Sequence, residues 1–312
     1  MDTLKEERWT RVRELFLKHA KELGVEAKIQ VANGNDALQY SQAENLLTQG
    51  VDVLVVAPHN GVTAASIVEL AHKYGKPVIS YDRLIQNAKV DLYVSFDNYE
   101  VGRMQAKYLL NKVPKGNYVL IEGAPTDNNA KILRAGQMEV LKPAIDRGDV
   151  KIVTEQWTRE WQPIEALKHV ENALIKANNH VHAVLAANDG TAGGAISALK
   201  QQNLDGKVAV TGQDAELAAV QRIAAGTQSM TIYKPIKNLT AKALDAAIAL
   251  AKGERPQNIN KMVDNGKGQV PSILLTPIVV DKQNIDKTIV EDQYHSPKDI
   301  YKDIKDTSKN VS

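Results

Sequence analysis

The sequence predicts an α/β fold of two lobes, each built on a parallel sheet with helices on both faces. Short apolar runs rich in β-branched residues alternate with longer amphipathic runs along most of the chain. This alternation is typical of strands and crossover helices in parallel sheets. About nine apolar runs occur, which is too many for one twisted open sheet in a chain of this length. Two smaller sheets are the simpler arrangement.

The first element is a helix, because Trp9, Val12, Phe16, Ala20 and Leu23 recur at a spacing of three to four residues before Gly24. Amphipathic runs then predict helices at residues 38–49, 64–74 and 101–113. Residues 262–281 break the rhythm with extended chain containing Gly and Pro, and we expect them to cross between the lobes. Strands are expected at residues 28–31, 52–57, 77–81, 92–96, 117–121, 151–156, 183–187, 208–212 and 228–233.

The composition excludes several classes of protein. Of the 312 residues, 43% are hydrophobic and 24% are charged, as in an ordinary globular protein. The formal net charge is +2 without a basic stripe, so nucleic acid is not an expected partner. The absence of cysteine excludes disulfides, thiolate zinc sites and a cysteine nucleophile. The opening residues do not have the pattern of a signal sequence.

Polar clusters follow six of the predicted strands. Ligands of open α/β sheets bind beyond the carboxyl ends of the strands, so these clusters are expected to line a common crevice. Any single cluster could equally be a set of turn and helix N-cap residues. The clusters are Pro58-His59-Asn60, Asp82-Arg83, Asp97-Asn98, Asp127-Asn128-Asn129, Asn188-Asp189 and Gln213-Asp214.

No common catalytic motif is present in the sequence. Phosphate-binding, dinucleotide-binding, zinc-protease and nucleophile-elbow motifs are all missing. The scattered histidines favour structural roles, no calcium-loop spacing occurs, and we expect neither a metal nor a cofactor. Asp82 and Asp214 could be read as a glycosidase pair. However, Arg83 beside Asp82 should lower the carboxyl pKa, whereas a general acid needs a raised pKa.

The residues at the strand ends suit a sugar better than a reaction. Planar carboxylate, amide and guanidinium groups can satisfy adjacent hydroxyls in pairs, and an indole face matches the C–H face of a sugar ring. Trp9, Trp157 and Trp161 are the only tryptophans. A core position is an equal alternative for Trp157, and it is less expected for Trp161 after Arg159 and Glu160.

Several motifs resemble those of the bacterial D-xylose-binding proteins, over nearly the whole chain and in one register. The motifs are Glu-Arg-Trp at 7–9, Ala-Asn-Gly-Asn at 32–35, Tyr-Asp-Arg at 81–83, Ser-Phe-Asp-Asn at 95–98, Asp-Asn-Asn-Ala-Lys at 127–131, Arg-Ala-Gly-Gln-Met at 134–138, Asn-Asp-Gly-Thr-Ala-Gly-Gly at 188–194, Gly-Gln-Asp at 212–214, Ile-Ala-Ala-Gly-Thr-Gln at 223–228, Tyr-Lys-Pro at 233–235 and Leu-Leu-Thr-Pro at 274–277.

The resemblance implies a type I periplasmic-binding fold, with two Rossmann-like lobes joined by three hinge crossings. The N-terminal lobe would comprise residues 1–98 and 236–276, and the C-terminal lobe residues 99–235 and 277–312. A sugar would bind between the lobes by hinge closure, without any bond being made or broken. By motif, the implied hydroxyl ligands are Arg8, Asp82, Arg83, Asn129, Asn188, Asp214 and Lys234, and the implied stacking faces are Trp9 and Trp161.

The resemblance also implies partners and a location. The ligand would be D-xylose, and the loaded protein would lie outside the cytoplasmic membrane, in the periplasm or held by a lipid anchor. There it would deliver sugar to a membrane ABC permease, or alternatively report to a sensor kinase or chemoreceptor. A sugar-responsive transcription regulator shares the core fold, but a DNA-binding helix-turn-helix has no room before the first lobe.

One departure from the family pattern concerns the first strand. The family begins with a strand that runs into the Glu-Arg-Trp motif, and here Met1 stands where that strand would end. We therefore expect an incomplete first sheet with unpaired backbone groups. Three explanations are open. The chain has been shortened and so lacks its first strand and signal segment, or its start codon has been misassigned, or a partner chain supplies the strand.

Overall fold

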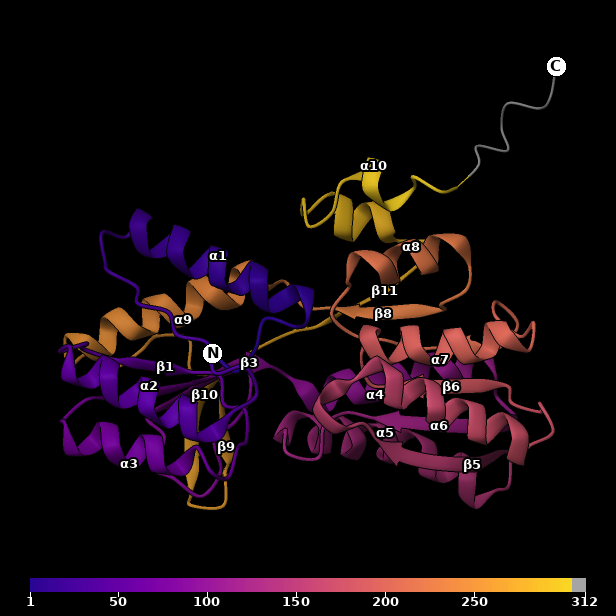
Figure 1. Ribbon diagram of the computed structural model, residues 1–312, viewed down its shortest axis with the longest axis horizontal. Helices are drawn as coiled ribbons and strands as arrows, with labels where there is room; N and C mark the ends of the chain where they lie inside the picture. Colours follow the sequence, from indigo (N-terminus) through magenta and orange to yellow (C-terminus); the bar gives the residue numbers. More distant parts are fainter. Residues whose placement is uncertain (305–312) are drawn as a thin grey trace. The chain divides into compact units, whose positions relative to one another are not determined.

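The computed structural model describes residues 1–304, and these form two compact units (Figure 1). Unit 1 comprises Met1–Asn98, Ala124–Ile132 and Pro235–Pro277. Unit 2 comprises Tyr99–Gly123, Leu133–Lys234 and the chain from Ile278 onward. The stretch 124–132 thus groups with unit 1, and with it Asn129. Residues 305–312, which the sequence-based C-terminal lobe includes, lie outside the described residues.

Unit 1 is a five-stranded sheet in the order β1-β2-β3-β10-β9, with helices on both faces. β1, β2, β3 and β10 are parallel, and β9 pairs with β10 in antiparallel orientation. α1 packs with α9 on one face, and α2 packs with α3 on the other (Figure 1). The strands are β1 Leu54–Val56, β2 Val78–Tyr81, β3 Leu92–Phe96, β9 Lys261–Asp264 and β10 Gln269–Leu275, and the helices are α1 Glu7–Glu22, α2 Asp36–Thr48, α3 Ala65–Lys73 and α9 Ile236–Ala251.

Unit 2 is a four-stranded parallel sheet in the order β5-β4-β6-β7, with a two-stranded antiparallel ribbon of β8 and β11. Backbone bonds from Ser229 N to Val210 O and from Ile232 N to Gly212 O link β8 to the end of β7. The strands are β4 Gly116–Glu122, β5 Val150–Trp157, β6 Ala183–Ala186, β7 Ala209–Val210, β8 Met230–Tyr233 and β11 Ile278–Asp281. The helices are α4 Asn98–Lys112, α5 Asn128–Asp146, η1 Arg159–Trp161, α6 Pro163–Lys176, α7 Asp189–Gln201, α8 Leu217–Ala225, η2 Asp286–Val290 and α10 Pro297–Ile300.

The predicted class, α/β with parallel sheets, is confirmed. α1 forms because its apolar positions make one buried stripe that includes Trp9, Val12 and Phe16, and Gly24 adopts a φ of 69° just after its end. α2 begins where the Asn35 side chain accepts a bond from Leu38 N. Residues 262–281, expected as a plain extended crossing, carry β9, β10 and β11.

One predicted strand is wrong. Residues 28–31 are extended but are not assigned as a strand, and the predicted run at 52–57 shortens to β1. β-branched composition alone does not make a strand, because a strand also needs a partner for its backbone groups. Among the described residues, no helix is long and apolar enough to span a membrane.

Candidate functional site

Asp82 is the centre of a polar cluster in unit 1. It follows β2 directly and adopts a left-handed backbone with a φ of 63°, which turns its side chain away from the line of the strand. Tyr93, Ser95 and Asn129 donate to its backbone carbonyl, at 2.9, 2.6 and 3.0 Å. Three donors on one carbonyl hold this strained residue in place.

The Asp82 carboxylate is paired with Arg8, which lies in the first turn of α1. Arg8 Nη2 lies 2.5 Å from Asp82 Oδ2, and Asn129 Nδ2 lies 3.3 Å from Asp82 Oδ1. The side chains of Arg8 and Asp82 are only 6% and 3% exposed. Residues from α1, from the end of β2 and from the start of α5 thus meet at one buried point, although 121 positions separate Arg8 from Asn129 in sequence.

Arg83 extends the cluster on its other side. Its Nη1 donates to Asp2 Oδ2 at 2.6 Å, and its Nε lies 2.9 Å from Asp127 Oδ2. Burial alone would lower the pKa of Arg83, but the carboxylates of Asp127 and Asp2 raise it overall. Asp2 also pairs with His59, at 3.0 Å from Nδ1, and this bond raises the pKa of the imidazole.

Trp9 lies against both arginines of the unit 1 cluster. The guanidinium carbons of Arg8 and Arg83 lie 4.9 and 5.4 Å from its ring centroid. Trp9 is 2% exposed. The indole therefore orders the two cations, and its role as a stacking face for a sugar stays a prediction.

The unit 2 cluster contains the remaining predicted ligands. Asp214, with a φ of 95°, accepts a bond at 2.8 Å from Lys234 Nζ, and the two side chains are 7% and 3% exposed. Asn188 is the N-cap of α7, where its side chain accepts from Thr191 N at 2.9 Å in a capping box. Asp189 N donates to Gln213 O and so connects Asn188 with the Asp214 loop.

Asp189, a residue without an assigned role in the sequence-based set, holds the unit 2 loops together. Its Oδ1 accepts from Gln228 at 2.8 Å, and its Oδ2 accepts from Thr231 and from Glu216 N at 2.9 and 3.0 Å. Arg222 Nη2 donates to its backbone oxygen at 2.9 Å. The carboxylate is fully buried, so these donors replace the water it has lost.

Trp161 ends the short η1 helix and lies directly on Gly123, at the end of β4. Glu160 and Trp161 both have positive φ values, 52° and 57°, which turn the indole toward the sheet. A Cβ at Gly123 would lie 2.1 Å from the ring. Glycine is therefore needed at this position, and the indole is 8% exposed.

Of the predicted ligands, Arg8 and Trp9 lie in α1, whereas most of the others follow the carboxyl ends of strands, as Asp82 and Arg83 follow β2, Asn188 follows β6 and Lys234 follows β8. The role of all of them as ligands stays a prediction.

Glu122, the residue before Gly123, is a buried acid. Gln105 donates to the backbone oxygens of Ala187 and Gly212, at 3.1 and 3.0 Å, so its side-chain oxygen faces Gln137, 3.0 Å away. Gln137 must then offer its nitrogen to Gln105 and its oxygen to Glu122, whose carboxyl oxygens lie at 3.1 and 3.2 Å. The Gln137 oxygen and a Glu122 carboxyl oxygen can form a hydrogen bond only if Glu122 carries a proton.

The pKa of Glu122 is raised to about 8, mainly by burial and also by the charge of Glu155, while Arg134 opposes the rise. The folded protein therefore holds a proton that the unfolded chain releases above its ordinary pKa of 4.5. We expect stability to fall as the pH rises from about 4.5 to about 8, and Glu122→Gln to flatten this decline. Urea unfolding at pH 5, 6.5 and 8 measures this change in the unfolding free energy. Glu44→Gln is the control, because Glu44 is exposed and its replacement should leave the slope unchanged. An unchanged slope in Glu122→Gln would contradict the assignment.

Sequence reasoning missed several residues of these clusters. Asp2, Tyr93 and Glu122 act through contacts with residues distant in the chain, which no local motif reveals. Asp189 belongs to the predicted strand-end cluster Asn188-Asp189, but its bonds to Gln228 and Thr231 were not predicted. Within residues 1–304, no group of acidic residues and histidines could hold a metal ion.

Comparisons with known proteins show which family the chain belongs to. The sequence profile of a periplasmic binding protein domain matches residues 1–255. The D-xylose-binding periplasmic protein of Escherichia coli (strain K12) is 50% identical over 96% of this chain and 91% of the relative. Its counterpart of the same name in Haemophilus influenzae is 48% identical over 96% of this chain and 90% of its own length.

A solved structure gives the same result. The ABC transporter solute-binding protein of Clostridium phytofermentans with bound β-D-glucose matches with a TM-score of 0.90 and 32% identity, over 96% of this chain and 98% of that chain. The chain belongs to the periplasmic binding proteins. The expected family is therefore confirmed.

Proposed function

We propose that this protein captures D-xylose outside the cytoplasmic membrane and delivers it to a membrane ABC transporter. The observation that supports this function most is the buried arrangement of Arg8, Asp82 and Asn129 in unit 1. It offers fixed cationic, anionic and amide groups at one point. Such groups bind adjacent sugar hydroxyls in pairs, and this binding involves no reaction of the ligand.

Unit 2 contributes the complementary groups in this proposal. Lys234 and Asp214 supply a second charged pair, Asn188 supplies an amide, and Trp161 supplies an apolar face for the ring. We propose that both sets contact one sugar in a closed state. Because the full set of contacts exists only there, sugar binding shifts the protein toward the closed state by its difference in affinity.

The absence of a reaction follows from the same contacts. The Asp82 carboxylate is already paired with Arg8, and the Asp214 carboxylate is paired with Lys234. Both carboxylates are therefore engaged in buried ion pairs, and we propose that they accept hydrogen bonds from sugar hydroxyls and do not act as proton donors. The relatives are named as binding proteins, and we propose binding without catalysis.

The choice of D-xylose rests on the relatives. Two proteins that cover nearly the whole chain at 50% and 48% identity carry xylose in their names, whereas the glucose-bound structure is 32% identical. A thermal-unfolding series with D-xylose, D-glucose, D-ribose and L-arabinose tests the choice, since a ligand that binds only the folded state raises the midpoint. D-xylose is expected to give the largest rise, and an equal rise with D-glucose would refute selectivity for the pentose.

Gly123→Ala is expected to weaken xylose binding by ~10- to 100-fold, because a methyl group here overlaps the Trp161 ring and pushes it off the end of β4. Trp161→Ala should weaken binding to a similar extent. Calorimetry of both variants and of the double variant measures this. If the double variant is no weaker than either single one, the two residues act as a unit. Full affinity in Gly123→Ala would show that the indole position does not matter.

The output of the loaded protein has one alternative. A membrane sensor kinase or chemoreceptor could read the closed state instead of a permease, as both would contact a sugar-dependent surface. We propose transport as the principal output. A signal segment or a lipid anchor would place the protein outside the cytoplasmic membrane, and a partner chain that supplies the first strand is a further candidate contact. Pull-down from membranes with and without xylose separates the outputs, because a transport component should retain the permease and not a sensor domain.

A further inference from the structure

The loop that carries Asp214 has a strained backbone. Asp214 and Ala215 follow one another with φ values of 95° and 51°, a left-handed conformation that is costly for residues other than glycine. Asp214 N donates to Ile232 O at 2.8 Å. Ala215 N donates to the Thr231 hydroxyl at 3.2 Å. Such strain persists only where surrounding contacts hold it, so the bonds of the two carbonyls are equally important.

Both carbonyls of this loop are bonded by the C-terminal segment, which we define as residues 285–300. His295 Nε2 lies 2.8 Å from Ala215 O, and the Tyr294 hydroxyl donates to Asp214 O at 3.4 Å. In each case 80 positions separate the two residues in the sequence. A carbonyl oxygen can only accept, so Nε2 of His295 carries a proton and is the donor. His295 is 5% exposed, so water does not readily replace this bond.

The C-terminal segment also contacts the strand that leads to Lys234. The ring centroids of Tyr294 and Tyr233 lie 4.9 Å apart, and the Tyr233 hydroxyl is bonded to the Asp292 carboxylate. Tyr233 is the last residue of β8 and directly precedes Lys234. The Lys234 ammonium in turn lies 2.8 Å from Asp214 Oδ1. The segment therefore contacts both parts of the chain that bring this ion pair together.

Apolar packing fixes the C-terminal segment on unit 2. Ile285, Ile289 and Ile300 are at most 1% exposed, and they belong to one apolar cluster with Val220 and Ile223 of α8. α10, at the end of the segment, lies beside α8 (Figure 1). Three buried isoleucines remove enough apolar surface from water to hold the segment in one place. It is therefore a fixed support for the loop it contacts.

We propose that His295 and Tyr294 are positioning residues for the sugar site, which set the geometry of Asp214 and Lys234 through the backbone and not through the ligand. This inference rests on the proposed function, in which that ion pair contacts the sugar. His295 and Tyr294 fix two successive carbonyls of the strained loop, and the Asp214 carboxylate thereby stays within reach of Lys234. Sugar affinity then depends on side chains that do not touch the sugar.

The test compares His295→Leu with His295→Gln, because both replacements are similar in size and only the Gln amide can donate to Ala215 O. His295→Leu is expected to weaken D-xylose binding by ~10-fold in calorimetry, whereas His295→Gln should keep the affinity within about threefold. Tyr294→Phe removes only the hydroxyl and its longer bond. It is expected to weaken binding by about threefold.

Crystal structures of the two His295 variants without sugar give a readout that does not depend on xylose. In His295→Leu the distance from Lys234 Nζ to Asp214 Oδ1 is expected to increase from 2.8 Å to more than ~4 Å, beyond the range of an ion pair. In His295→Gln the distance should stay short. His180→Ala is the matched control, because the exposed His180 ring lies 3.2 Å from Ala177 O in the same unit. Both readouts should be unchanged in this control.

A loss of stability alone is distinguished by Val170→Ala. Val170 is fully buried in the core around α6, so its truncation leaves a cavity and destabilises unit 2. The affinity of the folded variant for D-xylose should nevertheless be unchanged. An affinity loss in Val170→Ala equal to that in His295→Leu would assign His295 a merely structural role.

Three further results would overturn the proposal. They are full xylose affinity in His295→Leu, an equal loss in His295→Leu and His295→Gln, and an ion pair that stays at 2.8 Å in His295→Leu. If the unchanged protein binds no xylose, the proposed function fails, and the distance in the crystal structures still decides whether His295 positions the ion pair. If His295→Leu does not fold, full affinity in Tyr294→Phe overturns the proposal.

Discussion

Asp82→Asn is expected to lower the affinity for D-xylose by at least ~100-fold, which corresponds to about 3 kcal/mol. Asn has nearly the same shape and tolerates the left-handed backbone at this position, so the backbone should not change. What changes is the charge. Arg8 loses its carboxylate partner in a buried site, and the sugar loses an ionised acceptor.

Calorimetry on the folded variant measures this loss, and urea unfolding shows how much stability changes with it. Asp52→Asn is the matched control, because Asp52 is an exposed residue of the same unit, with a weak pair to Lys76 at 3.5 Å. Its affinity should equal that of the unchanged protein. An affinity within about threefold in Asp82→Asn would remove Asp82 from the site.

Asp189→Ala is expected to destabilise the protein by about 3–5 kcal/mol, because several buried donors lose their acceptor at a cost of about 1–3 kcal/mol each. Gln228, Thr231 and Glu216 N lose their common acceptor without access to water. Because these donors come from the start of α8, from β8 and from the turn before β8, these segments should also loosen. Xylose affinity should then fall as well, although Asp189 is not itself proposed as a ligand.

Urea denaturation gives the change in unfolding free energy. The unfolding free energy of Asp189→Asn should lie between those of the unchanged protein and Asp189→Ala. The amide keeps one acceptor oxygen, but its NH2 group faces donors where the second carboxylate oxygen was. Asp146→Ala is the control in the same unit, where Asp146 forms an exposed pair with Lys142 at 2.8 Å, and its effect should stay below about 1 kcal/mol. If Asp189→Ala matches this control, the carboxylate does not hold the loops together.

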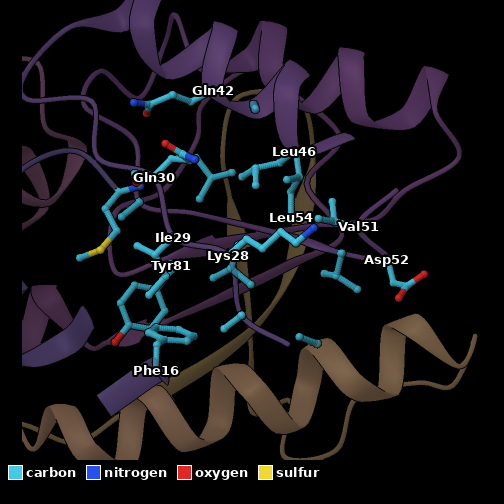
Figure 2. A pocket seen from close by; sticks show the side chains of 18 of the residues that line it. Phe16, Lys28, Ile29, Gln30, Gln42, Leu46, Val51, Asp52, Leu54 and Tyr81 are labelled. Atoms are coloured by element: carbon cyan, nitrogen blue, oxygen red, sulfur yellow. The ribbon is translucent and has the colours of Figure 1, made fainter. Parts of the chain in front are cut away.

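Local pattern was enough to predict most of the fold. The apolar stripe of α1 and the buried β-branched runs of β2, β3 and β4 are properties of short windows. Residues 28–31 have the same local pattern, but a cavity and not a strand lies beside them (Figure 2). Whether a run pairs depends on the segment next to it, so composition could not show that residues 28–31 form no strand.

The site was predictable only to the level of the loops. That Asp82, Arg83 and Asn129 follow strands is visible in the sequence, and the structure brings them together with Arg8 in unit 1. The positive φ of Asp82 and the pairing of Arg83 with Asp2 depend on tertiary contacts. Glu122 looks like any other acid in sequence, and its raised pKa arises from burial.

Calorimetric titration of the sugar-stripped protein with D-xylose tests the central claim most directly. Tight binding of one xylose per chain, with little heat from D-glucose, D-ribose and L-arabinose, is the predicted result. The same titration of Asp82→Asn should show weak binding or none. Absence of xylose binding, under conditions where the protein is fully folded, would contradict the claim.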